Sequence, residues 1–402
     1  MPQGSLAFSE ENTLRFAAQS DLLQSVGCNG EVSNALSGSG LTIDDLIYRN
    51  SRTAEWHGRT PPRLSSLEKI ARGIPFVSLF TGAGGMDLGF EAVGFSHLAA
   101  VENNEMFCNT LRLNRPGWKV FGPPSHAGDI SDFGKITDNL SAHVEMPFEG
   151  VFVGGPPCQP FSIAANQRFS KTGGNFKRVG FHHRKNGNHL FNFIRLIKAF
   201  RPVVFVIENV AGLRDIDKGQ QLAAAVQELE KIGYLVAHAD IHDAADYGVP
   251  QRRQRMFVVG ARRSGAFVLP NKQAHIGSGS VLSDIPGATA INHETRNHKA
   301  GSVLRYSRLD YGQRDQLGRV DRLDPTKPSK TVIAGGTKGG GRSHLHPEIP
   351  RTLTVRECAR LQTFPDGYEF TGPIARQFTQ VGNAVPPVMA AAIATQVAKT
   401  YF

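Results

Sequence analysis

A cysteine in a stiff, proline-rich turn is the strongest candidate for chemistry in the sequence. Cys158 follows two prolines and precedes a third within residues 154–162. Proline fixes φ and removes a backbone donor, so the thiol is expected on a rigid, non-helical turn. The apolar run at residues 150–153 is typical of a buried parallel strand, and open α/β sheets bind ligands at the carboxyl ends of such strands. A lone cysteine is more often a packing residue, but these surroundings favour a nucleophile.

A carboxylate and two arginines could complete a site around this thiol. Glu208 directly follows the apolar residues 203–207, and a carboxylate at the end of a buried strand needs a partner or a task. Burial would raise its pKa toward a protonated form that donates a hydrogen bond. We expect Glu208 to face Cys158 from the neighbouring strand end. Arg253 and Arg255 precede another apolar run and could reach the same pocket, although a basic surface turn would have the same composition.

A glycine-rich loop at residues 82–85 predicts a cofactor site. The loop follows the apolar residues 76–80, and glycine lets the backbone approach a ligand closely. Glu102, beyond the next apolar run, could hold ribose hydroxyls. A nicotinamide dinucleotide was the first cofactor to weigh, but Asp87 stands where the G-x-G-x-x-G pattern needs its third glycine.

The acidic residue beside this loop favours a different cofactor. Asp87 would repel a pyrophosphate but suits a ligand with ammonium and sulfonium groups, which indicates S-adenosylmethionine. Asp129 is expected in the loop after a third strand, where it could accept a hydrogen bond from the adenine amino group, with Ile130 against the ring. A plain glycine turn with two capping carboxylates is the alternative interpretation.

The composition is that of a soluble globular protein without structural metal or disulfides. The chain has 402 residues, 40% hydrophobic and 20% charged, which is enough for a large core and two domains. We find neither an apolar run of about 18 residues nor a signal peptide, and expect a cytoplasmic protein with no membrane contact. Its four cysteines lack a Cys-x-x-Cys pair, so no metal site is expected. Cys108 and Cys358 are interpreted as core residues.

Two basic tracts indicate a polyanionic partner. The net charge is +10, and residues 249–345 alone carry 17 Lys+Arg against 6 Asp+Glu. Residues 159–207 carry 9 Lys+Arg and no acidic residue. Concentrated positive charge in an otherwise balanced chain favours nucleic acid, although a solvated basic face would look the same.

Strand and helix patterns alternate through the middle of the chain. Strands are expected at residues 76–80, 97–101, 151–153, 203–207, 235–241 and 256–259. This alternation predicts an α/β fold with a doubly wound, mostly parallel sheet.

Four segments are predicted. Residues 1–72 form an N-terminal extension of unassigned role, with one or two helices packed on the main domain. Residues 73–263 form the catalytic and cofactor-binding domain. Residues 264–350, rich in Gly, Pro, His and Arg with little period, form a small irregular domain. Residues 351–402 return to the catalytic domain and end in an apolar helix that packs on the sheet.

Six blocks of this sequence resemble, in order, the motif set of the DNA (cytosine-5)-methyltransferases, especially the bacterial modification methylases. The resemblance spans residues 74–400 and is carried by residues 80–85 (FTGAGG), 156–159 (PPCQ), 208–210 (ENV), 251–255 (QRRQR), 356–365 (RECARLQTFP) and 380–387 (QVGNAVPP). It implies an S-adenosylmethionine-dependent methyltransferase domain and a small target-recognition domain on either side of a DNA cleft.

The resemblance also implies a mechanism. Cys158 adds to C6 of a flipped-out cytosine, and Glu208 neutralises the charge that develops on the ring. Arg253 contacts O2 of the base, and Arg255 braces Glu208. Cofactor-binding positions carried over are Phe80, Gly82, Gly84, Glu102, Asp129, Ile130, Pro157, Leu190 and Asn383. Residues implied to contact DNA, in a loop that closes over it, are Gln159, Ser162, Gln167, Arg168, Lys171, Lys177 and Arg178.

The implied substrate is double-stranded DNA, with a short target sequence read by residues 264–350. A cognate restriction endonuclease is a possible companion, and a monomer is expected. Three alternatives stay open: a tRNA cytosine-5 methyltransferase on the same scaffold, a nicotinamide dehydrogenase, and a DNA-binding module without catalysis.

Overall fold

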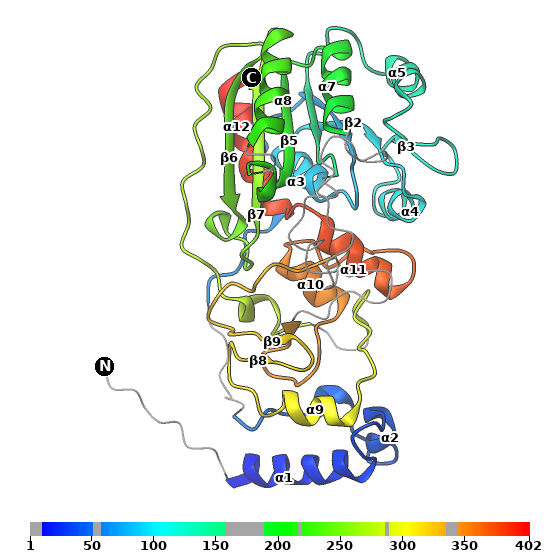
Figure 1. Ribbon diagram of the computed structural model, residues 1–402, viewed down its shortest axis with the longest axis vertical. Coiled ribbons are helices and arrows are strands. Elements are labelled where there is room, and N and C mark those ends of the chain that lie inside the picture. The colour runs from blue at the N-terminus through cyan, green and yellow to red at the C-terminus, as the bar shows by residue number, and fades with distance from the viewer. Residues whose placement is uncertain (1–9, 51–57, 158–188, 216–218, 286–288, 335–343) are drawn as a thin grey trace.

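A seven-stranded sheet forms one end of the molecule in the computed structural model (Figure 1). The structure describes residues 10–50, 58–157, 189–215, 219–285, 289–334 and 344–402. The strand order is β3-β2-β1-β4-β5-β7-β6. These strands are β1 (Pro75–Leu79), β2 (Ser96–Val101), β3 (Val120–Phe121), β4 (Val151–Gly154), β5 (Val204–Val210), β6 (Leu235–Asp243) and β7 (Gln254–Ala261).

Most of the sheet is parallel, as the alternating pattern predicts. All neighbouring pairs from β3 to β5 are parallel, whereas β7 runs antiparallel to both β5 and β6. The register sets Gly154 of β4 beside Ile207 of β5. The carboxyl ends of these two strands therefore meet at one edge, with Glu208 one residue further along.

The central strands β1, β4, β5 and β7 are buried on both faces because their side chains alternate between two apolar layers. Val204 and Val206 of β5 face one layer, and Phe205 and Ile207 face the other. The first layer is closed by α3 (Gly85–Val93) and α12 (Pro387–Tyr401). The second is closed by α5 (Phe133–Ser141), α7 (His189–Phe200) and α8 (Gln220–Lys231), while α4 (Glu105–Asn114) packs beside β3. The predicted doubly wound α/β fold is confirmed.

The chain returns to the sheet at its C-terminal end, after α10 (Val355–Leu361) and α11 (Ile374–Asn383). Helix α12 crosses α3 at Gly89, where an added Cβ would lie 2.5 Å from the Ala390 Cβ atom. The stretch Ile374–Tyr401 is long and apolar enough to span a membrane by composition, but 78% of its most apolar window is buried inside the protein. Core packing therefore accounts for its apolar character.

The segment 264–350 contains more regular structure than its composition indicates. It holds a three-stranded sheet of β8 (Arg314–Asp315), β9 (Val320–Arg322) and β10 (His344–Leu345), in the order β10-β9-β8. It also holds the 3₁₀ turn η7 (Ser278–Val281) and helix α9 (Ala300–Tyr306). These elements are short, and most of the described part of the segment has no regular secondary structure; strands of two or three residues are too short to leave a period in the sequence.

The N-terminal helices are present, but their expected position is wrong. Helices α1 (Glu10–Ser25) and α2 (Val32–Leu36) and the turn η1 (Ile43–Asp45) pack against α9, at the end of the molecule far from the large sheet (Figure 1). Residues 64–71 pack on the sheet instead: the turn η2 (Leu64–Ser66) contacts α3 and α12, and Ala71 is buried in the first apolar layer. The physical reason is that Ala300 and Val303 of α9 are apolar and become buried against the N-terminal helices.

Candidate active site

The loop after β1 turns sharply and uses left-handed backbone conformations to do so. Gly82 and Gly84 have φ of 59° and 76°, which glycine adopts without a steric penalty. Phe80 has φ of 55°, which is a strained value for an aromatic residue. Gly84 is also the N-cap residue of α3, so this helix begins directly after the loop, at the carboxyl edge of the sheet.

Glu102 fastens this loop to the end of β2. Its Oε2 accepts a hydrogen bond from the Gly82 amide at 2.8 Å, and its Oε1 accepts one from the Asn104 amide at 2.8 Å. The side chain is buried, and desolvation raises its pKa more than the amide hydrogen bonds lower it. The carboxyl group therefore holds the backbone in place, a task that the sequence did not indicate.

A small hollow opens beside Glu102 at the carboxyl edge of the sheet. It is lined by Phe80, Val101, Glu102, Asn103, Gly128 and Ile130. Three of the predicted cofactor positions, Phe80, Glu102 and Ile130, therefore share one pocket. Its aromatic and aliphatic walls suit a flat ring, and the buried carboxyl group at its edge suits a hydroxyl donor.

Asp87 does not face this hollow, so our argument from its charge is wrong. The side chain is fully buried, and its carboxylate accepts a hydrogen bond from the Ser78 hydroxyl at 3.0 Å. Its other oxygen lies 3.0 Å from Nε2 of His97, whose ring stacks on Trp118 with 3.9 Å between centroids. Asp87 points into the protein because it lies on the face of α3 that packs on β1 and β2.

The remaining predicted cofactor positions surround the same edge. Asp129 is exposed in the loop after β3, where its Oδ1 accepts the Ser131 amide at 2.9 Å. Leu190 lies in the first turn of α7 and packs in the apolar layer that includes Phe80. Asn383 is the exposed last residue of α11, and Pro157 is exposed after β4.

The returning C-terminal segment completes the glycine loop. A Cβ at Gly85 would collide with the Val385 carbonyl oxygen and would lie 3.1 Å from the Ala384 Cβ atom. Asn383 is therefore next to residues that touch the start of α3. The C-terminal segment therefore packs against the loop that joins β1 to α3.

Glu208 lies against the start of the proline-rich turn. A Cβ at Gly155 would be 2.8 Å from Oε2 of Glu208, so glycine is needed for this close approach. Asn209 donates a hydrogen bond from Nδ2 to the Pro156 carbonyl at 3.1 Å. Sequence reasoning gave Gly155 and Asn209 no separate role; their adjacency to Pro156 and Glu208 was the available signal. Cys158 lies outside the described residues, as do Gln159, Ser162, Gln167, Arg168, Lys171, Lys177 and Arg178.

Arg255 pairs with Glu208 across the strands. Its Nε lies 2.8 Å from the Glu208 Oε1, and both side chains are largely buried. Burial raises the pKa of Glu208 more than the charges of Arg255 and Arg253 lower it. The carboxyl group can therefore stay protonated to a higher pH than a solvated one.

Arg253 has a different environment from the one that the family resemblance implied. The side chain has no exposed surface, and its two Nη atoms donate to the carbonyl oxygens of Val332 at 3.1 Å and Gly382 at 2.7 Å. It therefore ties β7 to two segments that lie far along the chain. A direct contact with O2 of a base does not fit this burial.

Gln251 makes a second buried connection in the same region. Its Nε2 donates to Gln362 at 2.9 Å, and its Oε1 accepts the Val332 amide at 2.8 Å. The sequence placed Gln251 in a motif, but its buried contacts to Gln362 and Val332 could be seen only in the structure. Among the described residues, no group of three His, Cys, Asp or Glu side chains could hold a metal ion.

The chain matches the family model for C-5 cytosine-specific DNA methylases over residues 74–399. It is 35% identical to the Type II methyltransferase M1.HphI of Haemophilus parahaemolyticus, with 81% of this chain and 87% of that protein covered. It is 33% identical to M.BbvI of Brevibacillus brevis, with 80% and 90% covered.

Solved structures show the same fold. A proposed DNA modification methyltransferase encoded within an Escherichia coli prophage has a TM-score of 0.64 at 24% identity, with 81% of this chain and 98% of that chain covered. The Entamoeba histolytica methyltransferase EhMeth has a TM-score of 0.58 at 13% identity, with 81% and 97% covered. Together with the sheet-edge site, these matches show that the chain belongs to the C-5 cytosine-specific DNA methylase family and is a DNA cytosine-5 methyltransferase.

Proposed function

We propose that the chain methylates C5 of a flipped-out cytosine in a short, specific sequence of double-stranded DNA, with Cys158 as the nucleophile. The observation that carries this proposal is the position of Glu208, whose carboxyl group is buried, paired with Arg255 and packed against Gly155. Gly155 begins the turn that leads to Cys158 three residues later. The neighbouring strand ends therefore bring a proton donor to the base of the nucleophile's turn.

The chemistry requires each of these groups. C5 of cytosine is a weak nucleophile, and addition of the Cys158 thiolate to C6 makes it electron-rich. Glu208 donates a proton or a hydrogen bond to N3 and so neutralises the negative charge that develops on the ring. S-adenosyl-L-methionine supplies the methyl group and leaves as S-adenosyl-L-homocysteine. Loss of the C5 proton and elimination of the thiolate then restore the aromatic ring.

The hollow at the sheet edge fits the adenosine part of this methyl donor. Phe80 and Ile130 form its apolar walls, and Glu102 lies at its rim. We assign the ribose hydroxyls to Glu102 and the adenine amino group to Asp129. Gly82 and Gly84 keep the loop backbone free of side chains, and Asn383, Leu190 and Pro157 bound the same edge.

We assign Arg253 a positioning role in place of base contact. Its hydrogen bonds to the Val332 and Gly382 carbonyls join the start of β7 to residues 264–350, here called the recognition segment, and to the end of α11. Arg255 then remains as the arginine that contacts Glu208.

Target choice belongs, in this proposal, to residues 264–350, since their arginines can pair with guanine edges. The relatives are named Type II methyltransferases, which supports a role in restriction and modification. We further propose that the enzyme acts as a monomer in the cytoplasm, where bacterial DNA lies, and that a cognate endonuclease shares its target sequence.

Replacing the nucleophile tests the proposal. Cys158→Ala should abolish methyl transfer to duplex DNA while it leaves DNA binding within about twofold of the wild type. Cys28→Ala is the matched control, because Cys28 is exposed and lies outside the site; it should retain full activity. The measurements are bisulfite sequencing of DNA from expressing cells and incorporation of labelled methyl groups into duplex DNA and into tRNA.

A covalent adduct gives an independent readout. Duplex DNA that carries 5-fluorocytosine at the target should trap the wild-type enzyme, because fluorine cannot leave as the C5 proton does. A shifted band on a denaturing gel is expected for the wild type and for Cys28→Ala, and none for Cys158→Ala. Methyl incorporation into tRNA alone would contradict the proposed substrate.

A further inference from the structure

Residues 10–50, here called the N-terminal brace, lie outside the matched family region and pack on the recognition segment (Figure 1). The contact is partly backbone to backbone. The Val32 amide donates to the His298 carbonyl at 2.8 Å, and the Ala300 amide donates to the Gly30 carbonyl at 2.8 Å. Glu31 and Lys299 form an antiparallel bridge between these bonds.

An apolar cluster fixes the brace to α9. It consists of Leu23, Val32, Ala35, Leu36 and Leu46 from the brace, with Ala300 and Val303 from α9. All seven side chains are buried. The brace is therefore part of the folded recognition unit and does not behave as a separate domain.

Two polar anchors extend from the brace into the recognition segment. The first is Tyr48, whose ring lies 3.6 Å from the guanidinium carbon of Arg322; the ring of Tyr311 lies 3.9 Å from the same atom. Arg322 is fully buried and also donates to the carbonyls of Pro347 at 2.8 Å and Leu309 at 2.7 Å. The Tyr48 hydroxyl donates to the His346 carbonyl at 2.8 Å. A brace residue thus helps to hold β9 against the turn that follows β10.

The second anchor is Asp44, whose Oδ1 lies 2.6 Å from Nε of Arg351. The Nη atoms of Arg351 bind both carboxylate oxygens of Glu357 at 2.9 and 2.8 Å, and Glu357 lies in the first turn of α10. The two anchors therefore fix residues 346–351 at both ends, through Arg322 and through Arg351.

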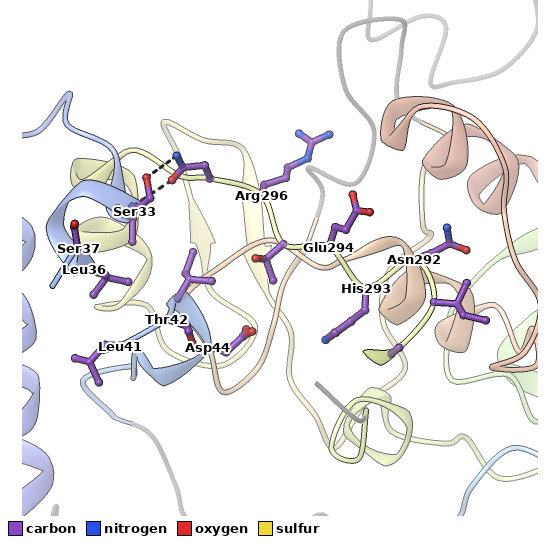
Figure 2. Close-up of a pocket in the computed structure, with 16 residues that line it drawn as sticks. Ser33, Leu36, Ser37, Leu41, Thr42, Asp44, Asn292, His293, Glu294 and Arg296 are labelled. Atoms are coloured by element: carbon purple, nitrogen blue, oxygen red, sulfur yellow. Dashed lines mark hydrogen bonds between the residues drawn. The ribbon is translucent and has the colours of Figure 1, made fainter. Parts of the chain in front are cut away.

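Next to the Asp44 anchor, part of the brace is separated from residues 290–297 of the recognition segment. Figure 2 shows a broad cleft between residues 32–44 and residues 290–297, bridged where Asn297 donates to the Ser33 hydroxyl at 2.9 Å.

The charge of the brace argues against a direct role in DNA binding. Residues 10–50 carry six acidic and two basic side chains, whereas residues 264–350 carry twelve Lys+Arg against seven Asp+Glu. Acidic surface repels phosphate, so the brace can act on DNA only through the residues that it holds.

We propose that Tyr48 is a specificity-determining positioning residue: by stacking on Arg322 and binding the His346 carbonyl, it fixes the buried residues 344–347 and, through them, the geometry of the recognition segment that reads the target sequence. This inference rests on the proposed role of residues 264–350 in target reading.

The test compares Tyr48→Ala with Tyr48→Phe once the target sequence is known. Tyr48→Ala should raise the KM for cognate duplex about tenfold and lower the rate ratio between the cognate duplex and duplexes with one changed base pair by a similar factor. The KM for S-adenosylmethionine should stay within twofold. Tyr48→Phe keeps the ring on Arg322 and should recover most of the ratio.

Tyr234→Ala is the matched control, because Tyr234 is equally buried and its hydroxyl donates to the Pro202 carbonyl at 2.7 Å within the catalytic unit. It should lower the melting temperature without changing the cognate-to-changed ratio. If Tyr48→Ala does not fold, Tyr48→Leu decides the matter, because it keeps an apolar side chain but removes the ring face and the hydroxyl; a smaller change in the same ratio is expected.

An unchanged ratio in the folded Tyr48→Ala protein would overturn the inference, as would an equal rise in both KM values. For a folded Tyr48→Leu protein, an unchanged ratio would have the same meaning. A wild-type enzyme that methylates no duplex DNA would instead overturn the proposed function, so the two failures are distinguishable.

Discussion

The large sheet and the recognition segment bury their interiors by different means. In the sheet, apolar side chains such as Phe205 alternate between two packed layers. In the recognition segment and the turn into α10, fully buried arginines, Arg322 and Arg351, are held by aromatic rings, carbonyl oxygens and carboxylates. Apolar packing is non-directional, whereas an arginine clamp fixes angles and distances. The difference indicates that the sheet supplies stability and the clamps supply geometry.

The largest effect should come from the sheet. Phe205→Ala removes a fully buried ring that packs on Tyr234 at 5.3 Å between centroids, and should lower the free energy of unfolding by about 4 kcal/mol. The loss should be the same at low and high salt, since no charge is involved. Urea denaturation at both salt concentrations checks this. Leu235→Ala, at a side chain that is 61% exposed on β6, is the control and should change little.

Removing the arginine of a clamp should lower the free energy of unfolding slightly less than Phe205→Ala does. The size of the loss should depend on whether the partner carboxylate is still present. Arg351→Ala leaves the Glu357 carboxylate buried without its ion pair and should lower the free energy of unfolding by about 3 kcal/mol. Combining it with Glu357→Leu should restore part of this loss, because the buried charge is then gone. Arg360→Ala is the matched control; its partners Asp284 and Asp366 are exposed, and it should cost less than about 1 kcal/mol. A double variant no more stable than Arg351→Ala would contradict the clamp as described.

The smallest effect is a pH dependence confined to the same clamp. Burial alone would raise the pKa of Glu357, but the charge and hydrogen bonds of Arg351 outweigh it and lower the pKa to about 2. The pair therefore stabilises the fold fully above the ordinary carboxyl pKa, and this contribution is lost as pH falls toward 2. The stability gap between wild type and Arg351→Ala should narrow from pH 6 to pH 3. The difference in stability between wild type and Phe205→Ala should stay constant over the same pH range. If both differences narrow together, the effect of acid does not arise from the Arg351–Glu357 pair.

Apolar periodicity could predict the centre of the sheet because β1, β4, β5 and β7 are buried on both faces and each leaves a run of β-branched or aromatic residues. It could not give strand direction, so the antiparallel β7 was found only in the structure. Motif order predicted that Glu208 and Arg255 belong to one site. It could not show which way a charged side chain points, and so Asp87 and Arg253 were misjudged: both are buried and hold other parts of the protein.

The recognition segment was beyond prediction for a related reason. Its strands of two and three residues are held by contacts to residues more than 250 positions away, such as Tyr48 with Arg322. Contacts between residues so far apart in the chain cannot be predicted from composition or from the local spacing of residues. For the same reason no role could be predicted for the N-terminal residues, whose partners lie between residues 297 and 351.

The crossing of α3 and α12 at Gly89 has a consequence for biosynthesis. Helix α3 emerges from the ribosome early, but the residues that cover it, 387–401, follow the whole recognition segment. The nascent chain must therefore carry an uncovered apolar layer while some 290 intervening residues are translated, which takes tens of seconds at bacterial elongation rates. We therefore expect a product truncated before α12 to leave this apolar layer uncovered and to be inactive.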